Sequence, residues 1–256
     1  MSARVFLRRL LFPPRCASCG DLIDGAHRNQ PLALCKSCEV KWDVQQNALC
    51  HCCGYPVHDC THSVPMLARH GVDTLIKLVE YDPQKPGEVG NRMIFKLKDQ
   101  ESAELQAFLA RELAPKIQKQ LLKLGQTPEN TVLVWAPRSI QACRDRGFDQ
   151  SKGICAALAR ELGLSKPVQM VRRTGGGTQK LLGSEHRAKN AFAAFEAVPE
   201  HCAALKGKCV ILVDDVVTTG ATLSAVAAKI KPFKPAHLIG ACIAVDVPPD
   251  RRYDLS

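Results

Sequence analysis

Hydrophobic residues in this chain fall into short continuous runs that alternate with amphipathic segments. The continuous runs are rich in β-branched residues, which is typical of strands buried on both faces of a parallel sheet. Strands are expected at 74–81, 131–136, 210–213 and 237–247. Helices are expected at 102–124, 150–162 and 223–230. Strands that alternate with helices predict an α/β fold in which helices flank a parallel sheet.

The composition is that of a globular protein that is not inserted in a membrane. Of 256 residues, 46% are hydrophobic and 5% are aromatic, and such values are ordinary for globular chains. No apolar run approaches the roughly 20 residues that are needed to span a bilayer. The apolar stretch 5–12 is interrupted by Arg8 and Arg9, and no small-residue cleavage site follows it before Cys16. We therefore expect no membrane insertion and a cytoplasmic location.

The chain contains thirteen cysteines, and eight of them lie before residue 65. In a reducing cytosol, clustered cysteines bind metal more often than they form disulfides. Two Cys-x-x-Cys pairs, Cys16 with Cys19 and Cys35 with Cys38, are separated by fifteen residues, which is the spacing of a zinc ribbon. Four thiolates complete a tetrahedral site and leave no open position, so this zinc is predicted to be structural.

A second cysteine group follows and is less complete. Its three thiols are those of Cys50, Cys53 and Cys60. The fourth ligand of a second zinc is left open between His62 and His58, and Cys52 offers a competing register. A segment this small, with few other large apolar residues, would hardly fold without metal.

The run from Val210 to Thr222 joins a buried strand to a helix. Four aliphatic residues are followed by Asp214 and Asp215, and then by a loop that is rich in hydroxyl groups. Backbone N–H groups at the start of a helix lack an intrahelical partner, so this junction is suited to a phosphate. Ionised carboxylates only accept hydrogen bonds, so the acidic pair is suited to ribose hydroxyls or to a divalent cation. The loop residues that would receive the phosphate are Thr218, Thr219, Gly220, Ala221 and Thr222.

Much of the formal net charge of +10 lies in one stretch of the chain. Residues 138–189 hold eleven basic and four acidic residues, an excess of seven positive charges. Arg138, Arg144 and Arg146 follow the expected strand at 131–136, where open α/β sheets bind ligands. Arginine forks suit the oxygens of pyrophosphate, and a polyanion would explain the charge. Exposed arginines on a mobile loop are the alternative.

Residues 210–222 resemble the phosphoribosyl-pyrophosphate (PRPP) signature of type I phosphoribosyltransferases, and the order of parts along the chain resembles the ComF family. This resemblance rests on the cysteine ribbon, the PRPP signature, Arg146-Gly147-Phe148-Asp149-Gln150-Ser151 and the later Thr178-Gln179. It implies a type I phosphoribosyltransferase-like parallel sheet flanked by helices, preceded by a small N-terminal zinc-ribbon domain. We place the zinc-ribbon domain at 1–65 and the phosphoribosyltransferase-like domain at 66–256.

The resemblance also implies roles for these residues. Asp214 and Asp215 would bind the ribose hydroxyls of PRPP, and the loop 218–222 would bind its 5′-phosphate. Beside what the resemblance implies, we expect Arg138 of the arginine loop to join this site and magnesium to neutralise the diphosphate of PRPP. Family members are linked to natural transformation and to incoming single-stranded DNA in the cytoplasm, with a competence helicase or a recombination protein as partner. The family brings no established reaction. A PRPP-dependent enzyme, a non-catalytic adaptor for nucleic acid or protein, and a nucleotide-salvage phosphoribosyltransferase all stay open.

Overall fold

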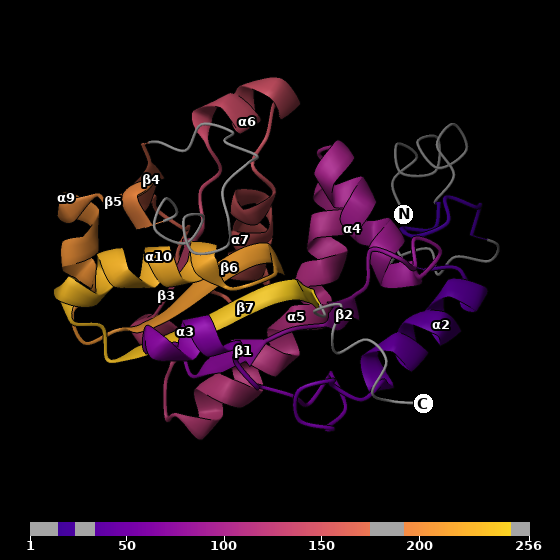
Figure 1. Ribbon diagram of the computed structural model, residues 1–256, viewed down its shortest axis with the longest axis horizontal. Helices are drawn as coiled ribbons and strands as arrows, with labels where there is room; N and C mark the ends of the chain where they lie inside the picture. Colours follow the sequence, from indigo (N-terminus) through magenta and orange to yellow (C-terminus); the bar gives the residue numbers. More distant parts are fainter. Residues whose placement is uncertain (1–14, 24–33, 175–191, 247–256) are drawn as a thin grey trace, which may run out of the picture.

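The computed structural model describes residues 15–23, 34–174 and 192–246. Its centre is a parallel sheet in which β1, β7, β6 and β3 follow one another, with β2 also paired to β7 (Figure 1). Two short strands, β4 and β5, form a separate antiparallel pair. The strands are β1 (Thr74–Ile76), β2 (Val79–Tyr81), β3 (Thr131–Trp135), β4 (Val171–Arg173), β5 (Phe195–Ala197), β6 (Cys209–Val217) and β7 (His237–Asp246).

Helices cover both faces of this sheet. Side chains of α5 and α7 pack on one face, and side chains of α3 and α10 pack on the other. The helices are α2 (Lys36–Asn47), α3 (Pro65–Arg69), α4 (Val89–Asp99), α5 (Ala103–Lys123), α6 (Ile140–Arg146), α7 (Gln150–Glu161), α9 (Pro199–Cys202) and α10 (Ala221–Ile230), with 3-10 turns at Pro128–Asn130, Ala203–Leu205 and Lys231–Phe233. The expected α/β architecture is therefore confirmed.

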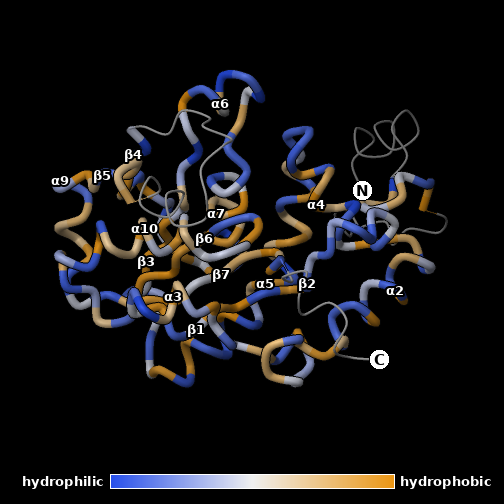
Figure 2. Tube along the Cα trace, in the orientation of Figure 1, coloured by the Kyte–Doolittle hydropathy of each residue, from blue (hydrophilic) through white to orange (hydrophobic). Residues whose placement is uncertain are grey.

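Strand β6 shows why the sheet is buried on both sides. Ile211 and Val213 belong to the core on the α5 and α7 side, whereas Val210 and Leu212 belong to the core on the α10 side. All four side chains are fully buried. Because side chains alternate along a strand, four consecutive aliphatic residues serve both faces. Figure 2 shows hydrophobic residues along β3 and β7, in contrast to the mainly hydrophilic α6.

The structure differs from the expected elements in three places. The expected strand at 74–81 is divided into β1 and β2, both of which pair with β7, and Lys77 lies in the interruption. Strand β6 continues to Val217, so the acidic pair lies inside the strand rather than after it. The expected loop at 138–149 contains the short helix α6. A propensity pattern does not detect the first two differences, because both depend on pairing with the distant strand β7.

The cysteine-rich segment shares a hydrophobic core with the α/β part of the chain. Trp42 of α2 is buried, and its ring lies 6.4 Å from that of Phe108 on α5. Its Nε1 donates to Glu112 at 2.9 Å. In Figure 1, α2 lies at one end of the molecule and α9 at the other. The proposed domain boundary falls at Pro65, where α3 begins, and it stays a prediction.

Candidate functional site

The loop between β6 and α10, which we call the threonine loop (Thr218–Thr222), borders a hollow of about 260 Å³ that Asp214 also lines. Gly220 immediately precedes α10 with a φ of 83°, a left-handed conformation that glycine adopts without strain. A Cβ at this position would lie 2.6 Å from Val64 Cγ2 and 2.9 Å from Leu67 Cγ. The segment that follows the cysteine groups therefore packs directly on this loop.

The acidic pair at the end of β6 is buried and satisfied within the protein. Asp214 Oδ1 accepts hydrogen bonds from Ser151 Oγ and from the Asp215 backbone N–H, both at 2.9 Å. Asp215 Oδ2 accepts from Arg138 Nη2 at 2.9 Å, and its Oδ1 accepts from the Val216 backbone N–H at 2.8 Å. Burial, followed by the negative charge of Asp215, raises the pKa of Asp214 well above its ordinary value of 3.8. Arg138 is the direct partner of Asp215. Burial lowers the pKa of Arg173, which lies close enough that the charge of Asp214 partly opposes this.

The three arginines predicted to face pyrophosphate do not lie together. Arg138 pairs with Asp215, and both Arg138 and Arg144 line a hollow of about 750 Å³ beside α6. Arg146 instead donates from Nη1 to the carbonyl of Lys98 at 2.7 Å. That carbonyl lies in the last turn of α4. Arg146 therefore links the end of α6 to α4 and does not join the other two arginine side chains.

Two residues at the start of α7 complete the site, and the sequence analysis gave them no role. Asp149 caps this helix by accepting from the Lys152 N–H, and its other oxygen accepts from the backbone N–H of Arg138. Ser151, from the first turn of α7, holds Asp214. The polar Asp-Gln-Ser start of a predicted helix was the available signal, because a capping aspartate fixes the position of the residues that follow it.

The first cysteine group has the geometry of a zinc site. The sulfur atoms of Cys16, Cys19, Cys35 and Cys38 all lie within 4.8 Å of one another. The sulfurs of Cys19 and Cys35 are 3.7 Å apart, close to the separation of about 3.8 Å that Zn–S bonds of 2.3 Å give in a tetrahedron. Burial opposes ionisation of Cys16, but backbone hydrogen bonds outweigh it and lower its pKa to about 6, whereas burial raises the pKa of Cys19 and of Cys38. The arrangement of the four sulfurs therefore carries the assignment. These thiols fit a structural zinc.

The second cysteine group brings together the predicted thiols of Cys50, Cys53 and Cys60, with all three sulfurs within 4.8 Å of one another. Among the described residues, neither candidate histidine joins this group. The ring nitrogens of His58 lie beside the Gln46 carbonyl and the Asp59 carboxylate. His62 contacts Cys60 through its backbone N–H. Cys52, the competing ligand, is exposed and lies outside the group.

A buried lysine stands beside this second group. Lys77 is 2% exposed, and its Nζ lies 3.0 Å from Cys60 Sγ and 3.4 Å from the His62 carbonyl. A hydrogen bond from Cys50 lowers the pKa of Cys60 to about 4, with burial opposing this and Lys77 adding to it. The ammonium thus compensates thiolate charge at the point where the sheet is interrupted. Sequence reasoning missed this residue, whose only signal was a charge between the apolar Ile76 and Leu78.

In the part of the chain that the structure describes, no helix combines the length and the apolar character that crossing a membrane requires. Residues 178 and 179, which contribute to the family resemblance, lie outside the described residues.

Comparisons with known proteins agree with this architecture. Residues 7–67 match the double zinc ribbon domain, and residues 153–254 match the phosphoribosyl transferase domain. The DNA utilization protein YhgH of Salmonella typhimurium is 30% identical over 214 residues, which cover 77% of this chain and 86% of that protein. An adenine phosphoribosyltransferase of Mycobacterium marinum is 32% identical over 100 residues, or 38% of this chain and 52% of that enzyme.

Among solved structures, hypoxanthine phosphoribosyltransferase of Trypanosoma cruzi is 19% identical with a TM-score of 0.34, covering 60% of this chain and 82% of that one. The double zinc ribbon, the phosphoribosyltransferase domain and the extent of the match to YhgH together confirm the expected family. This chain therefore belongs to the ComF family of phosphoribosyltransferase-type proteins with an N-terminal double zinc ribbon, the family of the DNA utilization protein YhgH.

Proposed function

We propose that this protein binds PRPP at the carboxyl end of β6. The observation that carries the proposal is the position of the acidic pair beside the threonine loop at the start of a ten-residue helix. The N–H groups of the first turn of α10 and the hydroxyls of Thr218, Thr219 and Thr222 would receive the 5′-phosphate. Asp214 and Asp215 would accept from the ribose hydroxyls.

Magnesium fits the same residues. Two carboxylates in a buried setting offer the hard oxygen ligands that this ion prefers. The pKa of Asp214, raised by burial and by Asp215, indicates a site in which further positive charge would be favourable. Magnesium would neutralise the diphosphate of PRPP, and Arg138 would supply positive charge on the other side of the pair.

The names of the relatives support a role in DNA use. The relatives that match most of the chain are named DNA utilization proteins, and we propose a cytoplasmic role during natural transformation, on or near incoming single-stranded DNA. A competence helicase or a recombination protein would be the partner. The excess of positive charge in the chain supports contact with a polyanion.

Calorimetry with PRPP and magnesium tests the ligand. We expect binding by the full chain and its loss in the Asp214→Ala/Asp215→Ala variant, with zinc content unchanged in both. A matched control replaces two exposed acids of α2, Glu39→Ala/Asp43→Ala, and should bind PRPP like the parent protein. Retained affinity in the Asp214→Ala/Asp215→Ala variant would refute the assignment of the pair, and absence of binding by the parent would refute the proposal.

A second candidate is a non-catalytic adaptor that retains the pocket without turnover. The ion pair between Arg138 and Asp215 favours it, because one of the two carboxylates already has a cationic partner within the protein. A PRPP-consumption assay with single-stranded DNA present separates the two, since an adaptor would release no pyrophosphate. The partial match to adenine phosphoribosyltransferase keeps a salvage enzyme as a third candidate, which pyrophosphate release with a free nucleobase would reveal.

A further inference from the structure

A groove with lysines on one wall lies between the second cysteine group and α5. It has a volume of about 580 Å³. The α5 wall contributes Lys116, Lys119 and Lys123, and the opposite wall contributes the chain from His58 to Thr61. The residues of this groove are different from those that line the hollow at the threonine loop.

The three lysines recur at helical spacing on one face of α5. From Lys116 to Lys123 the helix rises about 10 Å. Lys116 Nζ donates to the His58 carbonyl at 2.9 Å, and Lys119 Nζ pairs with Asp59 at 2.8 Å. Asp59 is the one carboxylate among the residues that line the groove. These contacts hold Lys116 and Lys119, and with Lys123 the wall keeps an excess of positive charge.

A second hollow, of about 880 Å³, continues this groove. Asp59, Cys60 and Thr61 line both spaces. Its lining includes Tyr55, whose side chain is 68% exposed. A large aromatic ring held on a short cysteine loop and open to solvent is available for stacking. Asp73 also lines this second hollow, so its charge is less positive than that of the lysine wall.

We infer that this continuous groove, from Lys123 to Tyr55, binds a single-stranded nucleic acid. The lysines hold consecutive phosphates and Tyr55 stacks on a base, which is how positively charged grooves with aromatic platforms hold single strands. An unpaired base exposes the face that the tyrosine needs, whereas a base inside a duplex does not. The inference rests on the proposed role in DNA use and assigns the strand to a surface apart from the PRPP site.

Fluorescence anisotropy with a labelled (dT)20 tests the groove in the full-length, zinc-loaded protein. Three phosphate contacts give a slope of about 2 in a plot of log Kd against log salt, and Lys119→Gln/Lys123→Gln should remove about 1.4 of it. We expect that variant to bind about tenfold more weakly at low salt. Tyr55→Ala should weaken binding about 5- to 100-fold with little change in the salt slope.

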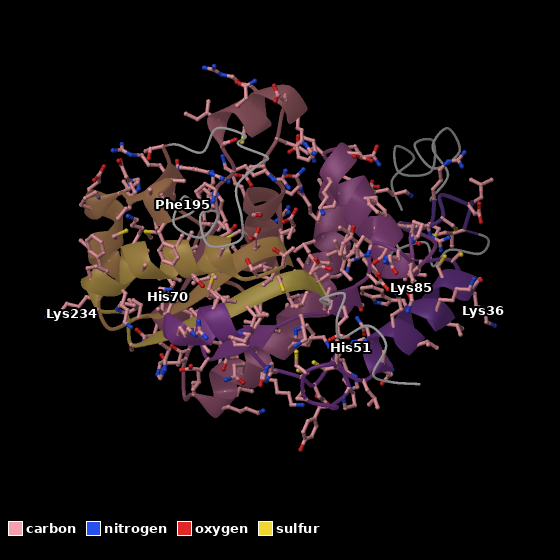
Figure 3. The ribbon with its side chains drawn as sticks, viewed as in Figure 1. Lys36, His51, His70, Lys85, Phe195 and Lys234 are labelled. Carbon is pink, nitrogen blue, oxygen red and sulfur yellow. The ribbon has the colours of Figure 1, made fainter. Side chains whose placement is uncertain are left out.

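A charge-matched control, Lys36→Gln/Lys206→Gln, removes two exposed lysines outside the groove. Figure 3 shows Lys36 at the outer end of α2, away from His51 in the second cysteine loop. This control should bind (dT)20 like the parent protein. Equal weakening in the control, unchanged binding in the groove variants, or equal affinity for duplex would overturn the inference. A parallel measurement with (rU)20 distinguishes RNA from DNA as the bound strand. Tighter binding of either single strand supports the inference.

The PRPP measurement keeps this inference separate from the proposed function. The groove variants should bind PRPP with unchanged affinity, because their residues do not line the hollow at the threonine loop. If the parent protein binds PRPP but no oligonucleotide, the groove assignment fails while the PRPP site stands. If it binds the oligonucleotide through the groove but binds no PRPP, the proposed PRPP site fails while the groove assignment stands.

Discussion

Arg138 Nη2 donates to Asp215 Oδ2 at 2.9 Å, joining the segment after β3 to the acidic pair of β6. The carboxylate is 10% exposed and the guanidinium 22% exposed, so both ends of the pair are largely withdrawn from water. Asp214 accepts from a serine and from a backbone N–H, neither of which carries charge. Arg138 thus supplies the direct cationic partner of Asp215, Arg173 interacts with the charge of Asp214, and a magnesium-bound ligand would enter a partly neutralised site.

Removing this arginine should destabilise the protein. Arg138→Gln leaves the Asp215 charge without its partner, and we expect the free energy of unfolding to fall by about 3 kcal/mol. Arg144→Gln, on the exposed face of α6, should change it by less than about 0.5 kcal/mol. Adding Asp215→Asn to Arg138→Gln should restore much of the loss, because a neutral amide needs no cation. Urea unfolding measures all four proteins, and equal stability of the two single variants would contradict the finding.

The contact between the threonine loop and the linker after the cysteine groups gives a second prediction. Gly207 and Gly220 both have positive φ, but a Cβ at Gly207 meets nothing within 4 Å. Gly207→Ala should therefore cost about 1–2 kcal/mol for the left-handed backbone alone. Gly220→Ala should cost about 1–3 kcal/mol more, because its methyl group overlaps Val64 and Leu67.

The excess cost at Gly220 measures the coupling of linker and loop. Adding Val64→Ala to Gly220→Ala relieves the closest overlap. The loss of unfolding free energy, measured with urea, should then come closer to that of Gly207→Ala. If Gly207→Ala and Gly220→Ala lowered the free energy of unfolding equally, the linker would be able to move away from the added methyl group without loss of stability. In that case the segment after the zinc ribbon does not constrain the loop.

The sequence predicted the elements that depend on local pattern. The buried run at 210–213, the acidic pair and the glycine before α10 identify a strand, a loop and a helix start within one short segment, and the structure contains all three. The two cysteine groups were predictable for a similar reason, because Cys-x-x-Cys spacing itself places two thiols on one turn.

Contacts between segments that are distant in the chain could not be predicted from the sequence. Ser151 and Asp214 are 63 positions apart, and their hydrogen bond follows from the packing of α7 on β6. Lys77 appears in the sequence as an ordinary strand residue, and its burial is explained by the approach of Cys60 and of the His62 carbonyl. Arg146 was predicted to face pyrophosphate from its place after a strand, but the intervening helix α6 carries it towards α4.

The two cysteine groups should differ in their contribution to metal content. We expect Cys35→Ser to lower zinc content by one equivalent and to reduce the thermal midpoint by several degrees, because zinc binding contributes directly to folding in small ribbons. Cys60→Ser should remove the other equivalent, that of the second group. In the parent protein this second zinc should be released to a chelator more readily than the first, since three thiols leave one position open. Cys52→Ser, outside both groups, is the control and should leave the content unchanged. Metal analysis after gel filtration gives the result, and full zinc content in Cys35→Ser would refute the first site.

Stability should depend on pH through Asp214. Burial and the charge of Asp215 raise its pKa in the folded protein, so the folded state holds this proton more tightly than the unfolded chain. The stability contributed by the proton is complete below the ordinary pKa of 3.8, and it falls as pH rises towards the raised value. Asp214→Asn keeps an oxygen for Ser151 and for the Asp215 N–H but removes the charge. It should raise the thermal midpoint at neutral pH, by roughly 2–4 °C for each 1 kcal/mol, while losing PRPP affinity.

The gain from Asp214→Asn should shrink as pH falls towards 3.8, where the aspartate is itself protonated. Thermal melts of both proteins between neutral pH and pH 4 measure this difference, with Asp145→Asn on exposed α6 as the control that shows no such trend. A constant difference across that range would mean that Asp214 is ionised in the folded protein throughout. A positive charge such as Arg138 would then outweigh burial, and magnesium would be unnecessary for neutralising the pair.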